Sequence, residues 1–455
     1  MKKNWEKRIL HLGLGRFHRG HQAVYYQRLA ETGDARFGTI SLSMRSPEAR
    51  DQLKAAEMKY PVLELSEKNL GVIWVESIRE ALDAQEDFDQ VLNSFGLSQI
   101  EIISLTVTEK GYCLDGNGEL NLTHPAIKKD LANPEHPHSA IGLLALGLKT
   151  RAEKSLPGVT ILSCDNLREN GLKLQNAIVA YLKKLAWNDT LAWVNKSTTF
   201  PNSMVDRIVP ALSQEQLIDF EQRFALNENS HLIATEEFSQ WVIEDKFFKE
   251  RPPLDLVGVQ FVEDVRPFEE IKLRMLNASH SFLAYAGMLR GHKYVHEAIA
   301  DISLLQKVEL LMLKEVVPLI KIPPGFDIVS YEETLISRFR NNQLPHQLRQ
   351  IAMDGSQKLP QRILPSLIEA HLQNSGKEVL LATVCAWLNY CWKVLDYDAN
   401  ELDDPLRDTF NQIERPERFY WFMQMLETAP FASLKNRDEL KKLIVQKSST
   451  YSLLI

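Results

Sequence analysis

The chain has 455 residues, of which 44% are hydrophobic and 25% charged, and its formal net charge is −7. This length predicts more than one domain, each able to bury its own core, and the mildly acidic balance excludes a basic nucleic-acid-binding protein. Because we find no leader pattern and no apolar run long enough to cross a bilayer, we expect a cytoplasmic protein with neither a nucleic acid nor a membrane as partner.

The first element is an apolar strand at 8–12, which runs into the turn Gly13-Leu-Gly15 and then a helical pattern at 21–31. Strand, Gly-x-Gly and helix follow one another in this order in dinucleotide-binding proteins. Gly13 permits the tight turn, and Gly15 lets the backbone approach a pyrophosphate at the start of the helix. His18 stands where a third glycine is expected, and Gly20 comes two residues late. His18 and His21 are then either structural first-turn residues or neighbours of the cofactor phosphates.

The next strand, at 38–43, predicts the cofactor preference only in part. An acidic residue after this strand would bind the ribose of NAD, but the segment continues as Ser43-Met-Arg45-Ser46. Since Arg45 could accommodate a 2′-phosphate, the residues leave both NAD and NADP open.

Further strand-like runs at 100–107, 158–164 and 257–263 alternate with helical patterns at 139–153 and 168–184. This alternation predicts a doubly wound parallel sheet. Asp165 and Asn166 follow the run at 158–164, and ligands bind at the carboxyl ends of such strands. Glu135-His136-Pro137-His138 resembles a metal clip, but the prolines indicate a solvated loop without a third ligand, so we expect no metal.

The four cysteines lie far apart or in apolar surroundings, and none forms a Cys-x-x-Cys pair. They are Cys113, Cys164, Cys385 and Cys391. Buried free thiols in a reducing compartment are the simplest interpretation.

From about Pro267 the strand signal fades, and segments such as 301–313 and 378–388 have helical period and length. We therefore expect two domains, 1–265 and 266–455, the second mainly helical. No low-complexity linker separates them.

Lys272-Leu-Arg-Met-Leu-Asn-Ala-Ser-His280 carries three polar side chains in an apolar helical pattern. On an α-helix, Lys272, Asn277 and His280 would project at roughly 0°, 140° and 80°, on one side of the axis. An amine, an amide and an imidazole together can polarise a carbonyl without a metal. The alternative is that Lys272 is solvated, Asn277 incidental and His280 a core histidine.

Six ordered motifs give the chain a resemblance to a known family. They are Gly-x-Gly-x-Phe-His-Arg-x-His-Gln at 13–22, Leu-Thr-Val-Thr-Glu-Lys-Gly-Tyr at 105–112, Ser-Cys-Asp-Asn-Leu-Arg-Glu-Asn-Gly at 163–171, Phe-Pro-Asn-Ser-Met-Val-Asp-Arg-Ile-Val-Pro at 200–210, the segment at 272–280, and Asp-Gly-Ser-Gln-Lys-Leu-Pro at 354–360. In this order they resemble the long-chain mannitol dehydrogenase family of polyol-specific long-chain dehydrogenases, over nearly the whole chain.

The resemblance implies an α/β N-terminal Rossmann-like doubly wound sheet that binds the dinucleotide, and a mainly α-helical C-terminal domain that binds substrate. Segments 106–113, 240–245 and 350–362 are most similar to family members that interconvert D-mannonate and D-fructuronate. It also implies NAD as the cofactor, with NADP not excluded, a small keto-uronate or ketose as substrate, and a monomer or weak homo-oligomer.

The resemblance further implies residue roles. Lys272 would be the general acid and base, for which burial or a neighbouring cation must disfavour its ammonium, because the reference pKa is about 10.4. Asn166 and Asn277 would donate hydrogen bonds to the alkoxide, His280 would hold an adjacent hydroxyl, and Glu109 would relay the proton. The expected cofactor-binding residues are Gly13, Gly15, Phe17, His18, Arg45, Thr106 and Asp165. The expected substrate-binding residues are Asp206, Arg340, His346, Arg349 and Lys358, since a uronate carboxylate needs a cationic partner.

Two alternatives stay open. Within the same class of enzyme, the chain could be a mannitol or arabinitol 2- or 4-dehydrogenase or a tagaturonate reductase, because the Lys-Asn-His set does not read the far end of a substrate. Outside it, the chain could be a silent nucleotide-binding regulator on a dehydrogenase scaffold, against which the intact Lys272, Asn277 and His280 argue.

Overall fold

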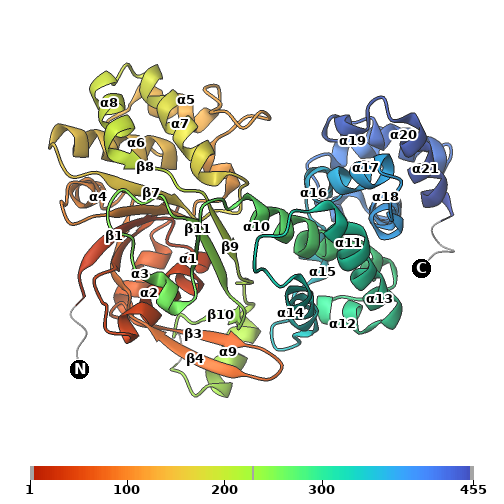
Figure 1. The fold of residues 1–455 in the computed structure, drawn as a ribbon, viewed down its shortest axis with the longest axis horizontal. Coiled ribbons are helices and arrows are strands. Elements are labelled where there is room, and N and C mark those ends of the chain that lie inside the picture. Colours follow the sequence, from red (N-terminus) through yellow and green to blue (C-terminus); the bar gives the residue numbers. More distant parts are fainter. Residues whose placement is uncertain (1–4, 228–229, 451–455) are drawn as a thin grey trace. The chain divides into compact units, whose positions relative to one another are not determined.

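The computed structural model describes residues 5–227 and 230–450. The chain divides into two units, Met1–Arg266 (unit 1) and Pro267–Ile455 (unit 2), one residue beyond the boundary expected from the sequence. Figure 1 shows strands and helices in the first unit and helices in the second.

Unit 1 is built on a six-stranded sheet in the order β5-β2-β1-β6-β7-β8, and every neighbouring pair is parallel. Leu10 in the central strand β1 lies in register with Ile40 of β2 on one side and Ile103 of β6 on the other. The strands are β1 (Lys7–Leu12), β2 (Gly38–Ser43), β5 (Ile78–Asp83), β6 (Ile102–Leu105), β7 (Val159–Ser163) and β8 (Thr198–Thr199).

Both faces of this sheet are buried. Leu10 and Leu12 belong to one apolar cluster and Ile9, directly before Leu10, belongs to another, because alternate side chains of a strand point to opposite faces. The helices of unit 1 are α1 (Arg16–Gly20), α2 (Gln22–Glu31), α3 (Glu48–Ala55), α4 (Phe88–Phe95), α5 (Pro125–Ala132), α6 (Ala140–Glu153), α7 (Asn170–Lys184), α8 (Asn188–Ser197) and α9 (Gln214–Arg223), with 3₁₀ turns η1 (Glu109–Tyr112) and η2 (Leu254–Val257). The prediction of a doubly wound sheet is confirmed.

Two three-stranded sheets complete unit 1. One has the order β10-β3-β4 and the other β12-β11-β9. Their strands are β3 (Tyr60–Leu65), β4 (Leu70–Val75), β9 (Ser203–Asp206), β10 (Ile233–Glu236), β11 (Gln240–Glu244) and β12 (Gln260–Val262). The run at 257–263 was expected as a strand of the main sheet, and this was wrong. Gly258, with φ +96°, separates the turn η2 from β12, which pairs with β11 instead.

Unit 2 is mainly helical, as predicted. Its elements are α10 (Arg266–Ile271), the π-helix η3 (Lys272–Asn277), α11 (Ala278–Leu289), α12 (Val295–Ala300), α13 (Ile302–Leu310), the π-helix η4 (Leu311–Val316), η5 (Val317–Leu319), α14 (Ile328–Arg340), α15 (Leu348–Ala352), α16 (Gly355–Arg362), α17 (Leu364–Leu372), α18 (Glu378–Tyr397), η6 (Ala399–Glu401), α19 (Arg407–Gln412), α20 (Arg418–Leu426), η7 (Ala429–Leu434) and α21 (Asp438–Ser449).

The helix α18 corrects one expectation from the sequence. Its 20 residues are long and apolar enough to cross a membrane, although no such run was expected. Two-thirds of its most apolar window is buried, including Trp387 and Cys391, as in the core helix of a water-soluble domain. Its apolar character is therefore explained by packing inside unit 2.

All four cysteines are buried free thiols, as predicted.

Candidate active site

The site in unit 1 begins where the order of the main sheet reverses. From β1 the chain moves to β2 on one side and later returns to β6 on the other. A crevice outside the carboxyl ends of β1 and β6 is the place where doubly wound sheets bind ligands. Gly13 follows β1 and Thr106 follows β6.

Gly13 and Thr106 approach each other so closely that no side chain fits between them. A Cβ on Gly13 would lie 2.1 Å from the Thr106 carbonyl oxygen, and the φ of Gly13 is +111°. The Thr106 hydroxyl donates a hydrogen bond to the Gly13 carbonyl at 2.8 Å. Glycine is therefore required at this turn for both steric and conformational reasons.

The next two glycines have different roles. A Cβ on the exposed Gly15 would meet no atom closer than 3.9 Å, which leaves open space at the start of α1 for a pyrophosphate. A Cβ on Gly20 would lie 2.9 Å from Thr235 and 3.0 Å from Ile233. Gly20 thus allows close packing of helix against sheet, which is the role of the third glycine in the dinucleotide fingerprint. The late position of Gly20 is compatible with dinucleotide binding.

The histidines near this turn support it from inside the protein. The rings of His11 and His18 stack at 3.5 Å between centroids, and both residues are fully buried. His18 Nε2 lies 3.1 Å from the Ser41 hydroxyl, and His21 Nε2 lies 3.1 Å from the Gln240 carbonyl. Burial lowers the pKa of His11 to about 3 and that of His18 well below its ordinary value, so both rings are neutral. This burial contradicts a phosphate contact by the His18 side chain, which instead packs beneath the turn.

Asp165 also faces inward. One carboxylate oxygen accepts a hydrogen bond from the Thr108 N–H at 2.7 Å, and the other accepts from the Val107 N–H at 3.1 Å and the Tyr112 hydroxyl at 2.9 Å. Burial raises the pKa of Asp165 to about 6. Its side chain therefore binds the segment after β6, rather than the cofactor for which it was predicted.

The remaining predicted residues of unit 1 differ in their solvent exposure. Asn166 and Glu109 are exposed and follow β7 and β6, so both lie at the carboxyl edge of the main sheet. Arg45 is exposed just after β2, and Phe17 is half-buried in α1, with its ring 5.0 Å from that of His21. Asp206 is buried at the end of β9.

In unit 2, Lys272 begins a π-helical segment, where an α-helix was predicted. The segment Lys272–Asn277 connects α10 with α11. A π-helix is hydrogen-bonded between residues i and i+5, so Asn277 follows Lys272 by about one turn. The angle between the two side chains around the helix axis is therefore smaller than the roughly 140° expected for an α-helix. Such segments are rare and frequently mark functional sites. Arg274 in the same segment forms ion pairs with Glu270 at 2.6 Å and Glu369 at 2.9 Å.

His280 packs against His346, with ring centroids 5.5 Å apart and the rings at 88°. Burial, followed by His346 and then Arg338, lowers the pKa of His280 well below its usual range. Burial, Lys358 and Arg338 lower the pKa of His346 to about 4. Two neutral imidazoles therefore lie within a region of positive charge.

The three cations predicted to bind a carboxylate differ in their surroundings. Lys358 is half-buried, and its ammonium donates to the Ile351 carbonyl at 3.2 Å. Arg340 is exposed at the end of α14. Arg349 is exposed and forms an ion pair with Glu401 at 2.7 Å.

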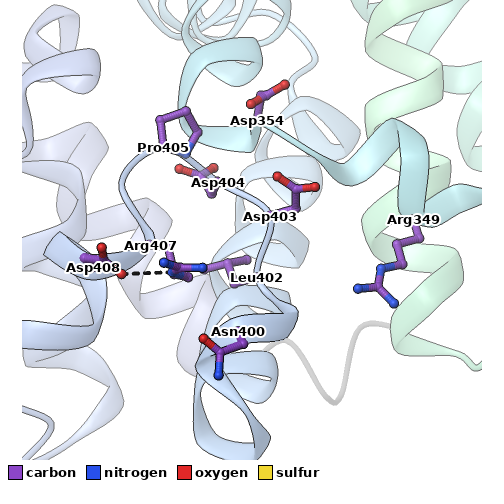
Figure 2. Close-up of a pocket in the computed structure, with 9 residues that line it drawn as sticks. All are labelled: Arg349, Asp354, Asn400, Leu402, Asp403, Asp404, Pro405, Arg407 and Asp408. Atoms are coloured by element: carbon purple, nitrogen blue, oxygen red, sulfur yellow. Dashed lines mark hydrogen bonds and ion pairs between the residues drawn. The ribbon is translucent and has the colours of Figure 1, made fainter.

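Arg349 also borders a cavity of about 550 Å³ in unit 2 (Figure 2). The cavity is lined by Arg349, Asp354, Asn400, Leu402, Asp403, Asp404, Pro405, Arg407 and Asp408. Four aspartates against two arginines make this a poorer environment for a carboxylate than the region around His346.

Two residues of interest were overlooked in the sequence. Glu269 lies three residues before Lys272 in one continuous helical segment, and this spacing was the available signal. Arg338 is buried beside both imidazoles, whereas the sequence pointed to Arg340. No sequence signal distinguishes a buried arginine from an exposed one two positions away.

In the loop that resembles a metal clip, two of the side chains contact other parts of the protein. Glu135 pairs with Lys149 at 2.8 Å, and the ring of His136 lies 4.9 Å from that of Phe88. Within residues 5–227 and 230–450, no three His, Cys, Asp or Glu side chains are grouped to hold a metal.

Comparisons with known proteins agree with this architecture. Residues 7–256 match the Mannitol dehydrogenase Rossmann domain, and residues 264–452 match the Mannitol dehydrogenase C-terminal domain. D-mannonate oxidoreductase of Escherichia coli (strain K12) is 42% identical over 90% of this chain and 85% of its own length. Mannitol 2-dehydrogenase of Pyricularia oryzae is 38% identical over 88% and 81%. The solved structure of Pseudomonas fluorescens mannitol 2-dehydrogenase, a ternary complex with NAD and D-mannitol, is 30% identical and covers 99% of this chain and 95% of its own, with a TM-score of 0.86.

Proposed function

Because the chain belongs to the mannitol dehydrogenase family, and is a dehydrogenase acting on a CH–OH group, we propose that it interconverts D-mannonate and D-fructuronate with NAD as cofactor. The relative named D-mannonate oxidoreductase supports this substrate at 42% identity. The family membership argues against a silent nucleotide-binding regulator.

The observation that carries the choice of an anionic substrate is the positive charge around the two imidazoles of unit 2. His280 is affected by Arg338, Arg362 and Lys272, and His346 by Lys358 and Arg338. Burying a uronate carboxylate costs several kcal/mol unless a cation accompanies it. A neutral ketose such as fructose has no such requirement.

In the proposed reduction, the lysine Nζ of Lys272 gives its proton to the C5 keto oxygen of fructuronate. For this transfer to occur near neutral pH, burial or a neighbouring cation must disfavour the ammonium, because the reference pKa of lysine is about 10.4. Asn166 and Asn277 donate hydrogen bonds to the oxygen as negative charge develops on it. His280, being neutral, can donate or accept and holds an adjacent substrate hydroxyl. The bound cofactor supplies the hydride.

Proton exchange between Lys272 and water needs a relay. We assign this role to Glu109, which is exposed at the carboxyl edge of the main sheet. Glu269, half-buried and one turn before Lys272, is a second candidate that belongs to the same helical segment. Replacing each by Gln and measuring the pH profile of turnover would separate the two.

Cofactor binding is assigned to the glycine turn and its neighbours. The open space at Gly15 and the tight contact of Gly13 with Thr106 fit a dinucleotide. We also assign to the cofactor Phe17, which is half-buried in α1, and Arg45, which is exposed after β2, the strand whose end binds the ribose in dinucleotide-binding sheets. The NAD-bound mannitol 2-dehydrogenase structure supports NAD at the level of the family.

The second candidate is a polyol dehydrogenase, which the relatives named mannitol 2-dehydrogenase favour at 38% and 30% identity. Arabinitol dehydrogenase and tagaturonate reductase belong to the same set of alternatives. The purified protein should be assayed with NADH and NADPH against fructuronate, tagaturonate, fructose and xylulose. We expect the highest kcat/KM with fructuronate and NADH. A higher value with fructose or xylulose would overturn the uronate proposal.

A further inference from the structure

The carboxylate of Asp165 joins the ends of two neighbouring strands. It lies two residues after the end of β7 and accepts three hydrogen bonds from the segment after β6, donated by Val107, Thr108 and Tyr112. Asp165 is only 6% exposed, so these protein donors, rather than water, solvate its charge. A buried carboxylate that loses its donors is costly, so the arrangement strongly favours one position of the segment 106–112.

One of those donors belongs to a residue with a strained backbone. Thr108 has φ +68° and ψ 160°, a region that is essentially restricted to glycine. For a β-branched residue this conformation is a genuine outlier. Such strain persists only where the surrounding structure holds the residue in place, and the 2.7 Å bond from the Thr108 N–H to Asp165 acts directly on it.

The same segment sets the shape of the glycine turn. Two residues before Thr108, the Thr106 hydroxyl donates to the Gly13 carbonyl at 2.8 Å. The backbone of Thr106 lies so close to Gly13 that a Cβ there would meet its carbonyl oxygen at 2.1 Å. A relaxation of the backbone at Thr108 would therefore be transmitted to the turn that approaches the pyrophosphate.

We propose that Asp165 is a positioning residue, which holds Thr108 in its strained conformation and thereby keeps the segment 106–109 against the glycine turn in the shape that binds the cofactor. Asp165 acts through the backbone and touches neither cofactor nor substrate. The inference rests on the proposed binding of a nicotinamide cofactor and deepens it.

The test is a double-mutant cycle between Asp165→Asn and Thr108→Gly, read out as the Kd for NADH. The Asn amide places an N–H₂ donor against a backbone N–H, so D165N should raise this Kd by about tenfold or more. Thr108→Gly removes the strain and makes the held conformation accessible without Asp165. The double variant should therefore return to within about threefold of the wild-type Kd, whereas T108G alone should change it by less than about threefold.

A second readout uses the protein without cofactor. Hydrogen–deuterium exchange in residues 106–112 should be faster in D165N than in the wild type. In the double variant it should be slower than in D165N. A structural effect of losing any buried carboxylate is controlled by Asp130→Asn. Asp130 is fully buried and accepts two backbone N–H bonds, from His138 at 2.8 Å and Ser139 at 2.9 Å. D130N should lower thermal stability and leave the Kd for NADH unchanged.

Each outcome has one meaning. A D165N protein that binds NADH as tightly as the wild type overturns the inference. A loss of affinity that T108G does not recover also overturns it, since Asp165 would then contact the cofactor itself.

If D165N fails to fold, Tyr112→Phe provides the test, because it removes one of the three donors. We expect a small rise in the Kd for NADH that T108G reverses, and an unchanged Kd overturns the inference. A wild-type protein that binds no NADH would instead refute the proposed function.

Discussion

His280 meets His346 edge to face, with ring centroids 5.5 Å apart, on the side of unit 2 that also carries the charges of Arg338 and Lys358. Both imidazoles are buried and neutral, and cations adjoin each of them. The pair thus combines hydrogen-bonding groups that carry no charge with a surrounding positive field, an arrangement suited to a polyhydroxylated anion.

The pKa of His346, lowered to about 4, predicts a pH dependence of stability. Between about pH 6.5 and 4 the unfolded chain binds a proton at this histidine and the folded chain does not, so the free energy of unfolding falls as the pH falls. The slope from one such group is about 1.4 kcal/mol per pH unit. His346→Gln should flatten the measured slope by about this amount between pH 6 and 4.5 in urea unfolding experiments. An identical slope in wild type and variant would contradict the lowered pKa.

Lys272→Ala should lower turnover by about 10²-fold or more while the Kd for NADH stays near the wild-type value, because a positioned proton donor contributes about this much. Steady-state kinetics and fluorescence titration with NADH would measure the two. Arg274→Ala is the matched control from the same π-helical segment. This variant loses the ion pairs of Arg274 with Glu270 and Glu369, so we expect lower thermal stability and only a small change in turnover. Near-wild-type turnover of K272A would remove lysine from the mechanism.

Removal of metal ions should have no effect on activity, since the proposed mechanism stabilises the alkoxide with amides and a lysine. The assay is turnover before and after dialysis against EDTA, with and without added zinc. Activity that is lost in chelator and restored by zinc would instead direct attention to His136 and His138.

NADH should be preferred over NADPH, as the NAD-bound family structure suggests. Arg45 is exposed after β2 and is the candidate for a contact with a 2′-phosphate. Arg45→Ala should therefore weaken NADPH binding more than NADH binding, by about tenfold for a lost charge-assisted hydrogen bond. Higher catalytic efficiency with NADPH in the wild type would make the preference wrong, and unchanged NADPH affinity in the variant would clear Arg45 of this role.

The substrate carboxylate should be held by at least one of Lys358, Arg340 and Arg349. Fructuronate carries this carboxylate and fructose does not, so the ratio of their kcat/KM values isolates the contact. Lys358→Ala should lower the ratio by about tenfold, because Lys358 lies near His346. Arg349→Ala should have a smaller effect, since its guanidinium pairs with Glu401 beside an acidic cavity. Unchanged ratios in all three single variants would favour the polyol dehydrogenase.

Much of the architecture was predictable because it depends on local periodicity. The strand at 38–43, the helix after Gly15 and the change to helices after Pro267 all follow from apolar spacing and turn residues over a few positions. The same local signals found the glycine turn and the segment from Lys272 to His280. The sequence by itself thus determined the order of elements and the residue types available for chemistry.

The tertiary structure decided how those residues are used. Gly20 can replace the missing third glycine because β10 packs closely against it, and the buried ring of His18 stacks on that of His11. The π-helical turn at Lys272 and the inward orientation of Asp165 likewise depend on packing and on hydrogen bonds between residues far apart in the chain. Local sequence patterns report which face of an element is apolar, but burial, backbone strain and electrostatic environment are set by neighbours that only the folded chain brings together.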